Sequence, residues 1–514
     1  MATASEQLIV VGGGAAGCAA AIEAAKLGLR VTLIDEHPQS LSAMSLDAPY
    51  FYGARLIPAL SDESLIADRV LGSNDLLMEC LEAGVEVLTG TCVWGSYRPG
   101  ANNLHLEANQ LGVADAKRSW MISYDHLILA PGSRDLVLSF PGWHLPGVLG
   151  VNGAIALLER YQALGGNRIA ILGSGNVALR AAKLIADAGM TVTAIVETAA
   201  NIRGDADLAA NLAAAGVPFF LSHTVERVIG DTEVKGIRLV KVDSSLTPLP
   251  GTTCDLDCDT VCMAFGAIPN IELASVTGCG IIFDSSRGGW VPDLDSRMQT
   301  SLASVYVVGD GAGVSEAMFL DPGIAGEQGR HAARAIAEGE GLLKDADAGT
   351  IAARSAAEKS EFPPQAWLQS LIAAGGLDVV VCQCEEVTRR ELLDVSPPRY
   401  LHAGNQRPAG GLQSLSPSGR RSQDLLKRLT RAGMGHCQGK RCRDQTAMLL
   451  AHAAGGDLES IVAGSYRTPV RPLPLNIMWA SDETEEMRRT WPTWLHPTED
   501  GIPERMDEND HGKR

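Results

Sequence analysis

The sequence predicts an α/β fold with two Rossmann-like dinucleotide-binding units and a small C-terminal helical module. A strand–glycine turn–helix–strand pattern begins at Gln7 and is repeated from Asn167. A later apolar strand ends on Gly309-Asp310, and two cysteine pairs follow nearer the C-terminus. Short apolar strands that alternate with helices are typical of a parallel sheet covered by helices.

The first pattern, "QLIVVGGGAAGCAAAIEAAKLGLRVTLIDE", has the features of a nucleotide-binding turn. Gly12, Gly14 and Gly17 have the G-x-G-x-x-G spacing. The first glycine permits the tight turn, the second lets a pyrophosphate approach the backbone, and the third lets helix and strand pack closely. Free N–H groups at the start of the helix, around Ala15 and Ala16, would hold the phosphates.

The strand after this helix ends on Asp35-Glu36, at the place where a carboxylate takes the ribose hydroxyls of a dinucleotide. Strand, turn, helix, second strand and acid occur in the expected order. We therefore expect this unit to bind a nucleotide.

The second pattern, "NRIAILGSGNVALRAAKLIADAGMTVTAIVE", repeats the turn at Gly173 and Gly175 and ends its strand on Glu197. Ala178 takes the place of the third glycine. The pattern predicts the same fold, but it leaves open whether NAD(H) binds there or whether the unit is only a packing surface.

Two strands connect these units. "YDHLILAPGSR" ends in a Pro-Gly turn at Gly132, and "TSLASVYVVGDGAG" closes on Gly309-Asp310. A helix with alanines at helical spacing is expected over roughly 323–338.

This order of motifs resembles the flavoproteins with two dinucleotide-binding domains, which include the glutathione-reductase and thioredoxin-reductase families. The resemblance covers roughly residues 6–340 and implies FAD in the first unit. It implies that Asp310 hydrogen-bonds the ribityl chain and that the following helix points its N-terminus at the flavin.

Two features depart from those families. The segment "HPQSLSAMSLDAPYFYG" after Asp35 has neither a redox cysteine pair nor a G-G-Q turn, so a truncated nucleotide such as ATP or ADP is an alternative to FAD. Cys254, Cys258 and Cys262 are spaced by four; we expect Cys262 to lie in a core strand and the three to have no redox role.

Four further cysteines suggest a metal centre. Cys382 and Cys384 form C-x-C in "VVCQCEEVT", and Cys437 and Cys442 form C-x4-C in "GMGHCQGKRC". Four converging thiolates can hold an iron–sulfur cluster, and the glycines let two sulfurs of one loop reach it. The alternatives are structural zinc, whose usual loops are C-x2-C, and core cysteines without a metal. His436 is expected to be a neighbour and not a ligand.

The segments "CQCEEVTRREL", "DLLKRLTRAGMGHCQGKRC" and "YRTPVRPLPL" resemble the bacterioferritin-associated-ferredoxin-like [2Fe–2S] module. That module is fused to flavoproteins in the alpha or A subunits of opine oxidases, D-hydroxyproline dehydrogenase and hydrogen cyanide synthase. The resemblance covers about residues 6–475. The segment between the cysteine pairs departs from it, and its Pro, Gly and Ser content predicts an inserted surface loop.

These patterns predict the following organisation: an FAD-binding domain over 1–142 and 271–345, an inserted NAD-like domain over 143–270, a helical connector over 346–377, the [2Fe–2S] module over 378–456 and a tail over 457–514. The tail is charged. Its Trp491, Trp494 and Leu495 are either parts of a solvated segment or anchors on a partner subunit.

Composition limits the partners and the location. The 514 residues carry a net charge of −18, which argues against nucleic acid as a partner. No apolar run is long enough for a transmembrane segment, and the 11 cysteines without a secretory signal indicate a reducing compartment. We expect a cytoplasmic protein, either free or peripheral at the inner membrane.

The sequence contains no recognisable general base or substrate-binding motif, so the catalytic residues are unknown. The resemblance implies an electron-transfer subunit whose partner, a beta flavoprotein, oxidises a secondary amine or amino acid, most readily an opine. It also implies FMN at an interface between subunits and leaves room for a small ferredoxin-like subunit. The alternatives are a self-contained NAD(P)H-dependent flavin reductase and an assembly scaffold with degenerate nucleotide sites.

Overall fold

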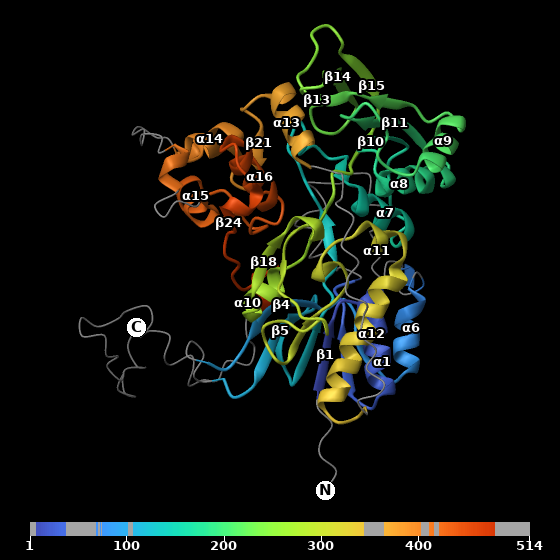
Figure 1. Cartoon of the computed structure of the whole chain (residues 1–514), viewed down its shortest axis with the longest axis vertical. Coiled ribbons are helices and arrows are strands. Elements are labelled where there is room, and N and C mark those ends of the chain that lie inside the picture. The colour runs from blue at the N-terminus through green and yellow to red at the C-terminus, as the bar shows by residue number, and fades with distance from the viewer. Residues whose placement is uncertain are drawn as a thin grey trace, which may run out of the picture.

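Figure 1 shows the computed structural model of the chain. The structure describes residues 7–37, 68–69, 72, 74–100, 106–343, 364–401, 411–415 and 421–478. Most of the segment after Asp35, the greater part of the predicted connector, and Trp491, Trp494 and Leu495 of the predicted tail lie outside these ranges.

The first unit is built on a parallel sheet with the strand order β20-β7-β1-β2-β3. Its strands are short and apolar because both faces are covered. The helices α1, α12 and α6 lie on one side and the antiparallel sheet β4-β5-β6 on the other (Figure 1). The strands are β1 (Gln7–Val11), β2 (Arg30–Ile34), β3 (Glu86–Leu88), β4 (Cys92–Tyr97), β5 (Asn109–Ala114), β6 (Ser119–Tyr124), β7 (His126–Leu129) and β20 (Val305–Val307).

The helices of this unit are α1 (Ala15–Lys26), α6 (Asp75–Glu82), α10 (Glu272–Thr277), α11 (Glu316–Leu320) and α12 (Pro322–Gly339). The helix α12 confirms the helix expected over 323–338. It packs on α1 so closely that a Cβ added at Gly329 would lie 2.0 Å from the Ala16 carbonyl oxygen.

The second unit has a parallel sheet of strand order β12-β11-β10-β16-β9. Alternate side chains of β10 enter two different cores, Ile169 and Ile171 on the side of the helices, Ala170 and Leu172 on the other. The strands are β9 (Val148–Gly150), β10 (Arg168–Leu172), β11 (Thr191–Glu197), β12 (Phe219–Leu221) and β16 (Thr260–Met263), and the helices are α7 (Val151–Glu159), α8 (Asn176–Asp187) and α9 (Ala206–Ala214).

An antiparallel sheet and one later helix cover the far side of this unit. The sheet order is β13-β14-β15, from β13 (His223–Ile229), β14 (Gly236–Lys241) and β15 (Cys254–Asp257). The helix α13 (Pro364–Gly375) packs beside it, with Trp367 buried against Phe265 at a ring separation of 4.8 Å. Two short antiparallel strand pairs are also present: β8 (Ser133–Asp135) with β17 (Ala267–Pro269), and β18 (Ile281–Asp284) with β19 (Gly289–Pro292).

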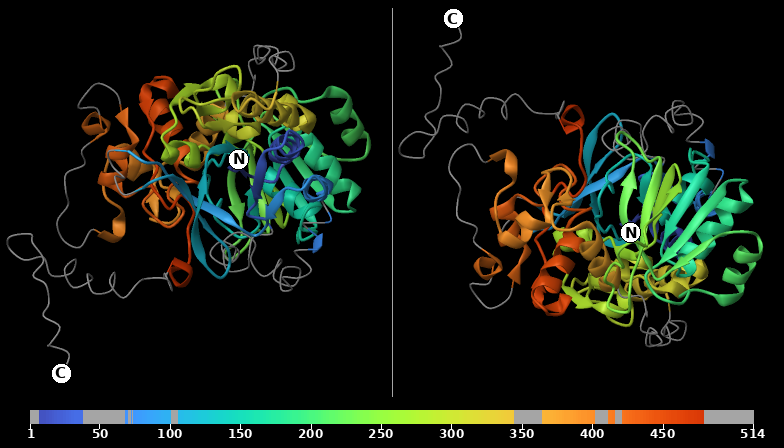
Figure 2. Two further views of the ribbon diagram at one scale, coloured as in Figure 1. Left: turned by 90° about the horizontal axis from the view of Figure 1, so that it is seen from below. Right: turned by 90° about the horizontal axis from the view of Figure 1, so that it is seen from above.

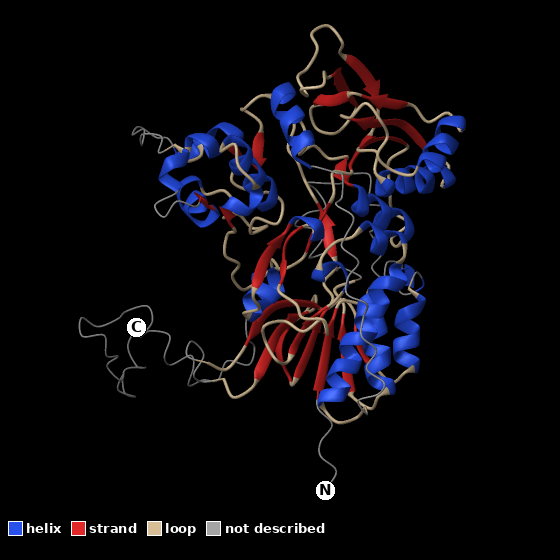
Figure 3. Cartoon of the chain, viewed as in Figure 1, coloured by secondary structure: helices blue, strands red, loops and turns tan. Residues whose placement is uncertain are grey.

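The C-terminal module is mainly helical and has its own apolar core (Figure 3). It contains β21 (Val380–Cys382), β22 (Val387–Thr388), α14 (Arg389–Asp394), β23 (Arg421–Ser422), α15 (Gln423–Thr430), α16 (Arg443–Ala453) and β24 (Ile461–Val462), before a last helix, α17 (Leu475–Met478). The module over residues 380–462, in orange and red, forms one flank of the molecule, opposite the green segments of the second unit (Figure 2), whereas α13 packs beside β13.

Only part of the segment between the cysteine pairs can be compared with its prediction as a surface loop. Residues 402–410 and 416–420 lie outside the described ranges. Between them, the short 3-10 turn Leu412–Leu415 inserts Leu415, fully buried, into the core of the module. The described part of this segment is therefore anchored to the module.

Candidate cofactor sites

The first glycine turn connects β1 to α1 and has the shape required for a phosphate. Gly12 has φ +108°, and a Cβ there would lie 2.1 Å from the Ala130 carbonyl oxygen, so only glycine fits. A Cβ at Gly14 would meet nothing within 4 Å, which leaves the open side of the turn accessible. Gly14 is the N-cap of α1 and provides no capping side chain, so the N–H groups of the first turn face this opening.

Asp35 follows β2 and lies directly against this turn. Its Oδ2 accepts a hydrogen bond from the Gly13 N–H, and its Oδ1 accepts from the His37 N–H at 2.7 Å and contacts the His37 ring Nδ1 at 2.9 Å. Burial alone would raise the pKa of Asp35, but the bonds from His37 and Gly13 outweigh it and hold the pKa below its usual value. Asp35 is therefore an ionised acceptor at the edge of the turn.

The Gly132 turn and Asp310 meet at the same edge of the sheet, because β7 and β20 are neighbours. Ser133 Oγ donates to Asp310 Oδ2 at 2.7 Å. Burial raises the pKa of Asp310 and this bond opposes the rise. The neighbouring Gly309 N–H donates to Gln328 of α12 at 2.9 Å. The structure thus brings Gly132 and Asp310 close to the first glycine turn.

Glu36, the next predicted nucleotide residue, has a partner from the C-terminal part of the chain. Arg471 Nε lies 3.0 Å from Glu36 Oε2. Burial would raise the pKa of Glu36, but the Arg471 charge reverses this and lowers it.

Glu197 of the second unit is placed differently from Asp35. Its side chain has no exposed surface, and both oxygens already have donors. Oε2 accepts from the Ser174 N–H at 3.2 Å and from Ser174 Oγ at 2.8 Å, and Oε1 accepts from Thr198 Oγ1 and the Ala199 N–H, both at 3.1 Å. The glycine turn at Gly173 and Gly175 has formed, but the Glu197 carboxylate beside it already accepts hydrogen bonds from neighbouring residues.

The four predicted metal-ligand cysteines come together in the module as two thiol pairs. Cys382 ends β21, and its thiol lies beside that of Cys442, the N-cap of α16. Cys384 follows in the turn after β21, and its thiol lies beside that of Cys437. Cys382, Cys437 and Cys442 are buried, whereas Cys384 is half-buried.

Backbone N–H groups point at these sulfurs. The Gly433 N–H donates to Cys382 Sγ at 3.4 Å. The bond from Cys384 lowers the pKa of Cys437 to about 5, with help from the N–H groups of Arg441 and Gly439 and against the effect of burial. His436 Nε2 lies 3.8 Å from Cys384 Sγ, and His436 is exposed, so it is a neighbour of the thiols.

The thiols are not arranged around a single point. Within the described ranges, no group of three or more His, Cys, Asp or Glu side chains has the geometry to hold a metal ion. The donor set itself fits an iron–sulfur cluster, because it consists of four thiols surrounded by N–H groups that can stabilise thiolates. A glycine-rich loop, with Gly435 packed against Cys384, supplies two of the four.

Comparison with known proteins identifies the class of the chain. The sequence profile named "Pyridine nucleotide-disulphide oxidoreductase" matches residues 6–339. The chain belongs to this family. A second profile, for the sarcosine oxidase A3 domain, matches residues 413–482.

Two curated relatives of this pyridine nucleotide-disulphide oxidoreductase align over nearly its whole length. The A subunit of opine oxidase from Agrobacterium tumefaciens is 26% identical over 499 residues, which cover 91% of this chain and 90% of the relative. The HcnB subunit of hydrogen cyanide synthase from Pseudomonas aeruginosa is 26% identical over 499 residues, covering 91% and 97%. These matches confirm the resemblance predicted from the motifs.

Among solved structures, L-proline dehydrogenase from P. horikoshii superposes with a TM-score of 0.59 at 18% identity, over 92% of this chain and 79% of that chain. At that identity the superposition supports the fold. Membership of the pyridine nucleotide-disulphide family makes the protein an oxidoreductase and implies FAD as a cofactor. Among the described residues, no helix combines the length and the apolar character that a bilayer span requires.

No disulfide joins any of the cysteines within the described ranges. Cys258 and Cys262 are buried in the cores of the second unit, which confirms the core position expected for Cys262. Cys254 is half-buried on β15.

Several residues at these sites were not predicted from the sequence. Ser133 directly follows the A-P-G turn, and that position could have pointed to it. His37 and Gln328 carry no recognisable signal, nor does Arg134, whose partner Asp444 is 310 positions away.

Proposed function

We propose that the chain is the flavin- and [2Fe–2S]-containing electron-transfer subunit of a multi-subunit oxidoreductase. In this proposal a partner flavoprotein with its own FAD oxidises a secondary amine or amino acid. The observation that carries it is the pairing of four thiols in a module that contacts the strand beside Asp310, through the bond from Arg134 Nε to the Lys440 carbonyl oxygen at 3.2 Å.

The two cofactors would divide the chemistry: a flavin accepts two electrons and releases them singly, and a [2Fe–2S] cluster carries one electron at a time. The chain's own residues bind and orient these groups. The N-terminus of α1 holds the pyrophosphate, Asp35 holds the ribose hydroxyls, and Asp310 with Ser133 holds the ribityl hydroxyls.

Cys382, Cys384, Cys437 and Cys442 are the proposed ligands of the cluster. The loop N–H groups that donate to Cys382 and Cys437 stabilise negative charge on the sulfurs. The spacing of the cysteines and the absence of C-x2-C loops favour iron–sulfur over zinc.

The substrate class is taken from the relatives. We propose an opine of the octopine or nopaline type, which is oxidised to an imine and then hydrolysed to an amino acid and a keto acid. Two of the relatives are named as the A subunit of opine oxidase, and their alignment spans the nucleotide units and the cysteine module together. Because these relatives are named as subunits, they support a partner chain; FMN at the interface and a small ferredoxin-like chain are further parts of the proposal.

The alternative is a self-contained NAD(P)H-dependent flavin reductase. It requires the second unit to bind the ribose of NAD(P)H through Glu197. Because the Glu197 carboxylate is buried and bonded to Ser174, Thr198 and Ala199, that acid would have to be released first. This arrangement favours the electron-transfer role.

The test is purification of the chain together with its partner, without added cofactors. We expect flavin absorbance, two irons per copy of this chain for a [2Fe–2S] centre, and released FAD. An opine should bleach the flavin only when the partner is present, and NADH should not bleach the isolated chain. Bleaching of the isolated chain by NADH would favour the alternative, and zinc in place of iron would refute the electron-transfer proposal.

A further inference from the structure

Three consecutive residues of β8 contact three different parts of the molecule. Ser133 donates to Asp310 in the first nucleotide site. Arg134 contacts the cysteine loop and the start of α16. Asp135 accepts from the Asn152 and Gly153 N–H groups, both at 3.1 Å, at the N-terminus of α7 in the second unit. This short strand therefore joins the flavin side of the protein to the cysteine module.

Arg134 is the residue that reaches the module. Its Nε donates to the Lys440 carbonyl oxygen at 3.2 Å, and its Nη2 donates to Asp444 Oδ2 at 3.0 Å. On the opposite side, Nη1 donates to Asn270 Oδ1 at 2.9 Å and lies 2.9 Å from Glu272 Oε1. The planar, forked guanidinium suits this arrangement, because it offers donors in several fixed directions.

The ion pairs of Arg134 are shielded from water. The side chain of Arg134 is 18% exposed, that of Glu272 is 8% exposed and that of Asp444 is 15% exposed. Burial would lower the pKa of Arg134, but the charges of Glu272 and Asp444 reverse this and raise it. Arg134 therefore remains charged, and removing it would leave two shielded carboxylates without their cation.

The two contacts in the module lie on either side of Cys442. Lys440 is in the loop between Cys437 and Cys442, and Asp444 is the second residue of α16, which Cys442 caps. Arg134 thus fixes the position of this loop relative to Ser133 and Asp310.

We propose that Arg134 is a positioning residue for electron transfer. It holds the Cys437–Cys442 loop at a fixed position relative to Ser133 and Asp310, on the proposed flavin side of the first unit. This inference rests on the proposed function. Arg134 makes or breaks no covalent bond and keeps its proton throughout, so it acts through geometry and charge. Residues that orient metal ligands in this way commonly change activity or affinity by about 10- to 100-fold when they are replaced.

The test uses the full-length protein with the cofactors it retains and four variants. Arg134→Gln removes the charge, Arg134→Lys keeps the charge but loses the fork, and Asp444→Asn removes one partner with little change of shape. Arg238→Gln is the matched control, because Arg238 forms an exposed ion pair with Asp255 at 2.6 Å in the second unit. Iron and flavin contents are measured first.

Electron transfer is then followed after photoreduction of the flavin, and hydrogen–deuterium exchange is measured over residues 433–444. We expect Arg134→Gln to slow reduction of the cluster about 10- to 100-fold at unchanged flavin content, and to speed exchange in this loop. Asp444→Asn should also slow reduction of the cluster and speed exchange in the loop. Arg134→Lys should restore part of the rate of cluster reduction, and Arg238→Gln should match the wild type in both measurements.

Wild-type transfer and exchange in both Arg134→Gln and Asp444→Asn would overturn the proposal, as would an equal loss in the Arg238→Gln control. If Arg134→Gln does not fold, Asp444→Asn decides. If the wild-type protein contains no iron or no flavin, the proposed function fails. In that case the exchange measurement still shows whether Arg134 holds the loop.

Discussion

Gly435 packs tightly against the other cysteine segment, at Cys384. A Cβ added there would lie 2.2 Å from Cys384 Cβ, a distance that real Cβ contacts do not reach. Cys384 is fixed by its neighbour Glu385, which accepts from Tyr400 at 2.6 Å and from Arg431 at 2.7 Å. The absence of a side chain at Gly435 is therefore a condition for pairing Cys384 with Cys437.

Replacing Gly435 with alanine should separate these segments. For the proposed [2Fe–2S] site, we expect Gly435→Ala to lose most of the bound iron; overpacking should also cost about 1–3 kcal/mol of stability. Iron per chain and thermal unfolding measure the two effects. Gly456→Ala is the control, because its Cβ would lie 3.5 Å from its nearest neighbour, Ser460 Oγ. Full iron content in Gly435→Ala would show that these thiols are not joint ligands.

The two acids at the ends of β2 and β11 show how far residue-level prediction reaches. The sequence places Asp35 and Glu197 at equivalent positions of repeated motifs. Both acids accept hydrogen bonds from their own chain, but the Asp35 side chain stays 13% exposed at the edge of the turn, whereas that of Glu197 is completely buried. A pattern of residue types shows where an acid lies on a strand, but not which hydroxyls and N–H groups the folded chain turns toward it.

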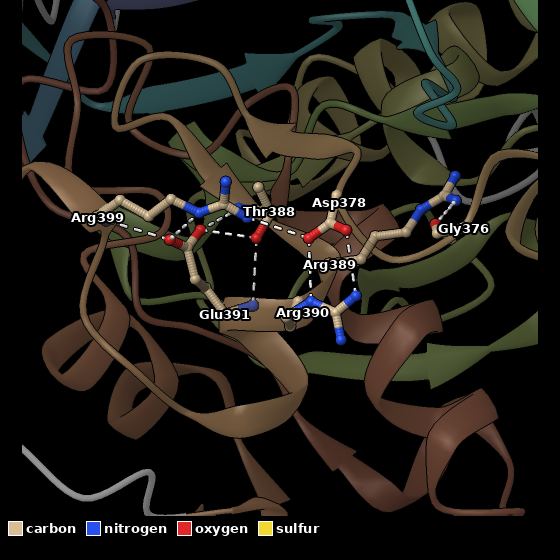
Figure 4. Close-up of polar contacts among 7 residues, drawn as sticks. All are labelled: Gly376, Asp378, Thr388, Arg389, Arg390, Glu391 and Arg399. Carbon is tan, nitrogen blue, oxygen red and sulfur yellow. Dashed lines mark hydrogen bonds and ion pairs between the residues drawn. The ribbon is translucent and has the colours of Figure 1, made fainter.

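At the scale of elements, α13 is held by a buried arginine of the module. The Arg389 guanidinium donates to the carbonyl oxygens of Leu371 at 3.1 Å and Gly376 at 2.8 Å, at the C-terminal end of α13, and also to that of Ser139. Its charge suits the negative end of the helix dipole. Figure 4 shows Arg389 directed at Gly376, beside the capping box of Thr388 and Glu391 that starts α14.

Arg389 and Arg390 are adjacent arginines with different surroundings, so their alanine variants can be compared directly. Arg389→Ala should destabilise the protein by about 3 kcal/mol or more, because buried carbonyl groups lose a charged donor. Arg390→Ala should cost less than about 1 kcal/mol, because Arg390 forms an exposed ion pair with Asp378 at 3.0 Å. Denaturant unfolding of both variants checks this. Equal losses would mean that Arg389 does not dock α13.

The elements were largely predictable from the sequence, but several of their contacts were not. Glycine turns and apolar strands identify β1, α1, β10 and α8, because turn chemistry and side-chain periodicity are local. The contact between β8 and α16 depends on two charges far apart in the chain, Arg134 and Asp444. No local pattern records such a pairing, so the position of the cysteine module beside the first unit could not be derived.

At the scale of the whole molecule, the chain returns from the module to the first unit. Tyr466 packs on Arg443 of α16, with 3.8 Å between the guanidinium carbon and the ring centre. The Val470 N–H then donates to the Trp94 carbonyl oxygen at 2.7 Å, and Val470 is buried in the core of the first unit. This segment and Arg134 therefore connect the module to the nucleotide site at two separate places.

The contact at Arg471 can be tested because Arg471 pairs with Glu36, which immediately follows Asp35, the proposed ribose-binding acid. Arg471→Ala should remove about 1 kcal/mol, the upper range for a partly exposed pair, and so let the segment detach about fivefold more often. Chymotrypsin cleavage after Tyr466 should speed by that factor. Because the segment lies at the rim of the nucleotide site, flavin should also dissociate faster from the variant.

Arg467→Ala is the control, since Arg467 is exposed and has no hydrogen bond or ion pair within the described ranges. Unchanged cleavage in Arg471→Ala, or the same increase in Arg467→Ala, would show that the Glu36 pair does not hold the segment and that the contact at Val470 suffices.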